Sequence, residues 1–83
     1  MSLIKALEKV ANAKELSLLL EVILTPKELQ EIGQRLEILN RLEHGEPQHK
    51  IAQKLHVGVA TVTRGASVIR SNSYQKIKHL LTT

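Results

Sequence analysis

A long run of apolar residues at steps of three and four constrains the fold of this chain more than any other feature. This spacing places side chains on one face of an α-helix. The run consists of Leu29, Ile32, Leu36, Leu39 and Leu42. Thr25-Pro-Lys-Glu28 before it is a capping box, and Gly45 after it suits the left-handed residue that follows a helix. The sequence therefore predicts a helix of roughly 19 residues, about 28 Å long, as the spine of an all-α domain.

The segment from Leu16 to Leu24 before this helix is apolar on nearly every side. Its only polar residues, Ser17 and Glu21, lie four apart and so share one face of a helix. The segment is much shorter than the run of about 20 apolar residues that crosses a membrane. We therefore expect its surface to be buried in a homodimer. The expected interface includes Leu18, Leu19, Val22 and Leu36.

Two helices and a tight turn are predicted after Gly45. The first begins at Glu46-Pro47 and ends near Leu55, the turn is His56-Val57-Gly58, and the second helix runs from Val59 to about Arg70. A small residue on the first helix and apolar residues facing it are typical of a helix-turn-helix, here at about 47–70. The predicted inward residues are Ile51, Ala52, Leu55, Val59, Val62, Ala66 and Ile69.

One helix at each end completes a six-helix arrangement. Apolar residues from Leu3 to Val10 predict a short first helix that ends near Asn12. Ser73 is expected to cap the last helix, which carries Ile77. No linker or repeat interrupts the chain, so residues 1–83 are expected to form a single domain.

Charge is distributed unequally between the two halves of the chain. Every acidic residue lies at or before Glu46, whereas the stretch from Pro47 to Thr83 has six Lys or Arg and no Asp or Glu. Such a stretch favours a polyanion as partner. Together with the helix-turn-helix spacing, it predicts binding to double-stranded DNA.

Several segments resemble the tryptophan repressor family of bacterial transcription regulators. The most specific is Val59-Ala-Thr-Val-Thr-Arg-Gly65, supported by Leu24-Thr-Pro, Gly33-Gln-Arg35 and Gly45-Glu46. The resemblance covers roughly Leu16 to Leu81. It implies an interlocked all-helical homodimer that represses transcription, with helix-turn-helix units in successive major grooves of a palindromic operator and L-tryptophan as corepressor.

The resemblance also implies which residues hold the corepressor. Thr25 and Arg64 would bind the carboxylate of the ligand. The backbone carbonyls of Val22 and Leu24 would accept from its ammonium group. Arg35 and Arg64 would sandwich its indole ring. Guanidinium groups suit both tasks. The remaining residues of this predicted site are Leu39, Gly65, which leaves room for the ring, and Val68.

Two departures from the family pattern affect the predicted corepressor site and the start of the helix-turn-helix. Val68 stands where many members have a hydroxyl that helps to bind the ammonium. The chain also has one residue fewer near Pro47, which changes the register of Gln48 to Lys50. Alternative roles are a surface ion pair for Arg35 and a phosphate contact for Arg64.

The predicted DNA contacts lie on both helices of the helix-turn-helix. Base edges are expected to meet the start of the second helix, and phosphates the first helix. The base-contacting set is Val59, Ala60, Thr61 and Thr63. The flanking set is Gln48, Lys50 and Lys54 for phosphates, His49 as a base reader, and Arg64.

Other functional classes are disfavoured by composition. Tyr74 is the only aromatic residue, which argues against reading single strands by base stacking. The absence of cysteine excludes disulfides and thiolate metal sites, and with no signal peptide it fits the cytoplasm. The histidines are expected to be solvated, with no metal site, and no nucleophile is paired with a base, so no enzyme is predicted.

Two alternatives remain open from the sequence. The chain could be a helix-turn-helix regulator of the same fold that works without a ligand. It could instead be a helical adaptor whose basic half meets an acidic protein. Binding to random duplex DNA with a strong dependence on salt separates a regulator from an adaptor.

Overall fold

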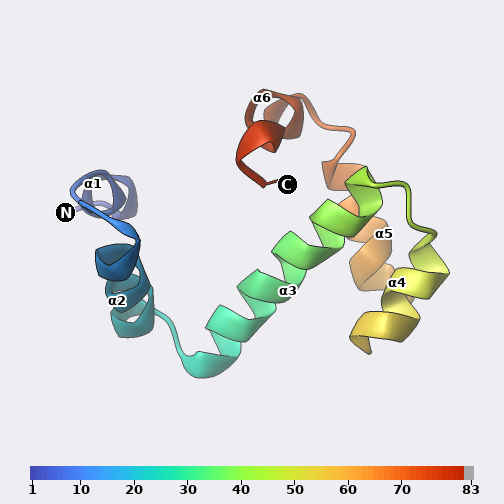
Figure 1. Cartoon of the computed structure of the whole chain (residues 1–83), viewed down its shortest axis with the longest axis horizontal. Coiled ribbons are helices and arrows are strands. Elements are labelled where there is room, and N and C mark those ends of the chain that lie inside the picture. Colours follow the sequence, from blue (N-terminus) through green and yellow to red (C-terminus); the bar gives the residue numbers. More distant parts are fainter. Residues whose placement is uncertain (82–83) are drawn as a thin grey trace. The chain divides into compact units, whose positions relative to one another are not determined.

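The computed structural model describes residues 1–81, and in that range it contains helices and no strand (Figure 1). The prediction of an all-α fold with six helices is confirmed. The chain divides into two compact units, one from Met1 to Glu31 and the other from Ile32 onward. The helices are α1 (Leu3–Glu8), α2 (Ala13–Ile23), α3 (Pro26–Glu43), α4 (Gln48–Leu55), α5 (Val59–Val68) and α6 (Asn72–Leu81).

Asn12 begins α2 rather than ending α1. Its side-chain oxygen accepts a hydrogen bond from the backbone N–H of Glu15 at 2.9 Å. The Glu15 carboxylate accepts in turn from the N–H of Ala11 at 3.1 Å. This reciprocal cap satisfies two N–H groups that a helix start leaves unpaired. The expected end of the first helix near Asn12 is therefore wrong, because α1 already ends at Glu8.

The start and end signals of α3 are confirmed. The Thr25 hydroxyl accepts from the N–H of Glu28 at 3.1 Å, and the Glu28 carboxylate accepts from the N–H of Thr25 at 2.9 Å. The hydrogen bonds from the backbone N–H and the hydroxyl of Thr25 lower the pKa of Glu28. Gly45 has φ +82°, in the left-handed region, and its N–H donates to the carbonyl of Leu42. The sequence thus predicted the bounds of the longest helix.

A small aliphatic core joins α3, α4 and α5 in the second unit. Its fully or almost fully buried members are Ile38, Ile51, Ala52 and Val62, and partly buried Leu42, Leu55 and Val57 pack against them. In Figure 1, α4 and α5 lie side by side. The sequence predicted most of the contributions that α4 and α5 make to this core.

Val59 was expected to face inward but is 56 % exposed. It is the first residue of α5, and the buried residues of that helix, Val62 and Ala66, lie three and seven residues further along. Helical spacing alone did not reveal that the described residues leave Val59, at the N-terminal end of α5, largely uncovered.

The turn between α4 and α5 places a residue with a side chain in a left-handed conformation. His56 has φ +55° and ψ +45°, and the N–H of Val57 donates to the carbonyl of Ala52 at 3.1 Å. This conformation costs a residue other than glycine roughly 1 kcal/mol. His56 therefore occupies a position that suits glycine.

Ser71, not Ser73, caps α6. The Ser71 hydroxyl oxygen accepts from the N–H of Tyr74 at 3.1 Å and its O–H donates to the carbonyl of Val68 at 2.7 Å. It thereby joins the end of α5 to the start of α6. Both serines fit a cap by type, but α6 begins at Asn72, so Ser73 already lies within the helix.

Gly65 allows a close approach of α5 to α3. A Cβ atom at this position would lie 2.9 Å from Cγ2 of Ile38 and 3.2 Å from Cδ1 of Leu42. The Ile38 methyl is attached directly to its own Cβ and cannot turn away without moving in the core. We therefore expect Gly65 to be required for packing within the second unit.

Gly65→Ala should lower the free energy of unfolding by about 1 kcal/mol, because overpacking outweighs the gain in helix propensity. Denaturant unfolding at a fixed protein concentration measures this change. Gly33→Ala is the matched control, since Gly33 also lies within a helix and no atom lies within 4 Å of its missing Cβ, and it should raise stability by up to about 1 kcal/mol. Stabilisation by Gly65→Ala would contradict the packing role.

Candidate functional site

The residues predicted to contact DNA all lie at the surface of α4 and α5. Each of them is exposed: Gln48, His49, Lys50, Lys54, Val59, Ala60, Thr61, Thr63 and Arg64. They project from the two helices whose opposite sides form the core with Ile38. A rigid pair of helices therefore carries a surface with basic and hydroxyl groups and no carboxylate of its own.

Two of these residues contact each other across the α4–α5 pair. The Thr63 hydroxyl donates a hydrogen bond to the side-chain oxygen of Gln48 at 3.0 Å. The two side chains come from the first turn of α4 and the middle of α5. Their contact fixes the position of a hydroxyl on the face predicted to meet DNA.

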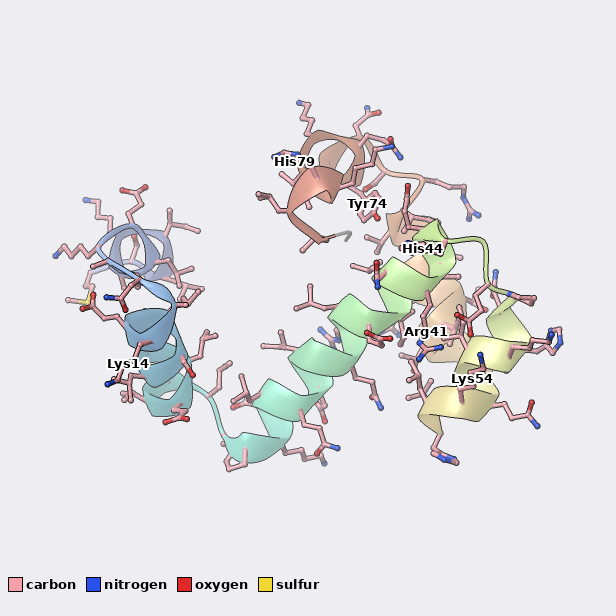
Figure 2. All side chains as sticks on the ribbon, in the orientation of Figure 1. Lys14, Arg41, His44, Lys54, Tyr74 and His79 are labelled. Atoms are coloured by element: carbon pink, nitrogen blue, oxygen red, sulfur yellow. The ribbon has the colours of Figure 1, made fainter. Side chains whose placement is uncertain are left out.

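Lys54 belongs to an ion-pair network between the end of α3 and α4, where Figure 2 labels Arg41 and Lys54. Its Nζ lies 3.1 Å from Oε1 of Glu46. Nη1 of Arg41 lies 3.0 Å from the same oxygen, and Nε of Arg41 lies 2.8 Å from Glu37. Hydrogen bonds from Lys54 and then Arg41 lower the pKa of Glu46, against the opposing effect of burial.

This network was not predicted from the sequence. The i,i+4 spacing of Glu37 and Arg41 is a usable signal for their pair. Nothing in the spacing of Glu46 and Lys54 predicts an ion pair, because the two residues meet only through the turn that leads into α4.

The residues of the first unit that are predicted to bind the ammonium and carboxylate groups of the ligand lie where α2 ends and α3 begins. The carbonyl of Val22 is in the last turn of α2, where helices leave acceptors unpaired and favour cations. Leu24 follows in an extended conformation. The Thr25 hydroxyl oxygen accepts from the backbone N–H of Glu28.

The other predicted corepressor residues belong to the second unit. Arg35 and Arg64 are exposed, and among the residues that the structure describes neither makes an ion pair with an acid. Leu39 lies next to Gly65, with Cδ2 3.9 Å from the Cβ position of the glycine. Side-chain atoms of Ile38 and Leu42 lie beside the position that a Cβ of Gly65 would occupy. That Gly65 leaves room for a ring stays a prediction. Val68 is 42 % exposed.

Comparison with known proteins decides the family. A family model described as "Trp repressor protein" matches residues 1–82. The chain belongs to the Trp repressor family. A protein named "Trp operon repressor homolog" from Vibrio parahaemolyticus is 35% identical over 83 residues, covering 95% of this chain and 81% of the relative. A relative of the same name from Xylella fastidiosa is 36% identical over 72 residues, covering 86% and 78%. No solved structure matches.

Members of the Trp repressor family are transcription regulators and not enzymes. The resemblance drawn from the run Val59 to Gly65 is thus confirmed, and the chain is a repressor-like regulator. Within residues 1–81, no helix is long and apolar enough to cross a membrane. In the same range no group of His, Asp and Glu side chains is arranged to hold a metal ion.

In this Trp repressor family member, α6 is attached to the end of α3 by a contact that sequence analysis missed. Tyr74 is 2 % exposed and its O–H donates to the Glu43 carboxylate at 3.1 Å. Nζ of Lys78 lies 3.8 Å from the other oxygen of Glu43. Tyr74 lies close to the C-terminal end of α3 in Figure 2. Burial first, and then the Glu43 hydrogen bond and charge, raise the pKa of Tyr74.

Stability should fall as the pH rises above the ordinary tyrosine value of 10.0, because the folded state favours the neutral phenol. The contribution is fully present below that pH and is lost as the pH passes through the raised pKa of Tyr74. Tyrosinate absorbance measures the titration directly, since Tyr74 is the only aromatic residue. Glu43→Gln should lower the pKa of Tyr74. An unchanged pKa in this variant would contradict the contact with Glu43.

Proposed function

We propose that this protein is a sequence-specific DNA-binding repressor that acts as a homodimer and uses L-tryptophan as corepressor. The observation that carries the proposal is the exposed surface of α4 and α5, in a half of the chain that has no acidic residue after Glu46. The relatives are named Trp operon repressor homologs, and these names agree with regulation of a Trp operon.

The DNA contacts would follow the docking mode of a helix-turn-helix, of which Trp repressors are a known example. The first turns of α5 would enter the major groove, with Thr61 nearest to the base edges. Lys50 would contact a phosphate, because it is exposed and the described residues provide it with no carboxylate partner. Phosphate contacts supply affinity and α5 supplies the sequence preference.

Exposed aliphatic side chains support a homodimer. Leu18 is 53 % exposed, Val22 82 % and Leu36 43 % in the single chain. Large apolar surfaces of this kind in small soluble proteins mark interaction sites. A second copy would cover them and provide the two recognition helices that a palindromic operator needs.

The chemistry of the predicted corepressor residues fits an amino acid with an aromatic side chain. Arg35 and Arg64 can stack on a ring, and a guanidinium with the Thr25 hydroxyl can bind a carboxylate. The carbonyls of Val22 and Leu24 can accept from an ammonium group. L-Tryptophan carries all three groups, and Val68 leaves the ammonium without one hydroxyl partner.

Equilibrium binding to labelled duplex DNA tests the proposal. The protein should bind an operator selected from palindromic duplexes more tightly than random duplex, with affinity that falls steeply as salt increases. Added L-tryptophan should strengthen binding to the operator. Equal operator binding with and without L-tryptophan would favour a ligand-independent regulator. Absence of binding to any duplex would favour a protein-interaction adaptor.

A further inference from the structure

The lysines of α4 have different surroundings in the structure. Lys50 is exposed and has no ion pair with a described residue, whereas Nζ of Lys54 lies 3.1 Å from Oε1 of Glu46. Both lie on the helix proposed to flank DNA. Only Lys50 offers an uncompensated positive charge to a phosphate.

Glu46 is fixed where it can compete for Lys54. Its side chain is only 21% exposed, and both of its oxygens accept from Nη1 of Arg41, at 3.0 and 3.3 Å. Arg41 is itself held by Glu37 at 2.8 Å. The carboxylate therefore remains beside α4 when DNA approaches, and a phosphate at Lys54 must displace or share it.

We propose that Glu46 acts as an internal competitor for the DNA phosphate at Lys54, and thereby limits the sequence-independent part of DNA affinity. The inference rests on the proposed DNA-binding function. A lysine that is already neutralised by a carboxylate releases few counterions from DNA, so it adds little to affinity or to its salt dependence. Glu46 thus determines how strongly the protein binds duplexes without an operator.

Glu46→Gln should free Lys54 while keeping a side chain that can accept from Arg41. We expect the affinity for random duplex at 0.15 M salt to rise about five-fold, and the salt slope to steepen by about one, as for one added phosphate contact. Glu37→Gln is the matched control, because it removes the same charge and also contacts Arg41, but not Lys54. It should give a much smaller rise, and Glu46→Gln with Lys54→Ala should lose the gain.

Variants of the two lysines test the inference with Glu46 intact, should Glu46→Gln fail to fold. Lys50→Ala should reduce the salt slope for random duplex by about one, whereas Lys54→Ala should leave it nearly unchanged. Equal gains in affinity for random duplex from Glu46→Gln and Glu37→Gln would overturn the inference, and so would equal losses of salt slope from the two lysine variants. Neither result would affect the proposed function. If the unmodified protein binds neither random duplex nor operator, the proposed function fails and the inference fails with it.

Discussion

Leu18→Glu should convert the protein from a dimer to a monomer or unfold it, at a cost of several kcal/mol. The side chain is 53 % exposed in the single chain, so a glutamate there would be nearly harmless to a monomer. In the proposed dimer the same charge would be buried without a partner, which is among the most destabilising changes known. Sedimentation equilibrium and denaturant unfolding measure the two outcomes.

Ser17→Glu is the matched control for this change. It places the same charge on the neighbouring residue of α2, which belongs to the polar side of the helix with Glu21. The cost should be only a few tenths of a kcal/mol, from repulsion between charges four residues apart. A monomeric unmodified protein, or equal effects of the two substitutions, would contradict the dimer.

Arg64→Ala should weaken L-tryptophan binding roughly a hundredfold, or about 3 kcal/mol. The variant removes a charge-assisted hydrogen bond to the carboxylate and a guanidinium from one face of the indole. Because the chain has no tryptophan of its own, all indole fluorescence in a titration comes from the ligand.

Arg70→Ala provides the control for net charge. Arg70 is also exposed and lies in the same acid-free half of the chain, but it is not among the predicted corepressor residues. Its loss should change L-tryptophan binding less than two-fold, as expected for an exposed charge that does not contact the ligand and is screened by salt. Equal losses in both variants would indicate a general electrostatic effect and remove Arg64 from the site.

Local signals predicted the ends of helices well where only one nearby residue could cap or terminate the helix. The capping box at Thr25 and Glu28 and the left-handed Gly45 are of this kind. Prediction failed where neighbouring residues competed for a role. Asn12 fitted both the end of one helix and the start of the next, and Ser71 and Ser73 were both possible caps of α6.

Apart from the exposure of Val59, the surface predicted to meet DNA could be identified from the sequence, because exposure follows from helical spacing and charge. Contacts between distant residues could not. Tyr74 with Glu43 and Lys54 with Glu46 depend on how helices meet after the chain has turned. The role of Gly65 depends likewise on the approach of Ile38, which no local pattern reveals.

The most direct test of the account is operator binding by the unmodified protein with and without saturating L-tryptophan. We expect L-tryptophan to strengthen operator binding by about 1–3 kcal/mol, a factor of roughly 5 to 150. Because binding free energies are reciprocal, operator DNA should strengthen L-tryptophan binding by the same factor. Operator affinity that does not change with L-tryptophan, together with no heat in a calorimetric titration of the ligand, would contradict corepressor control.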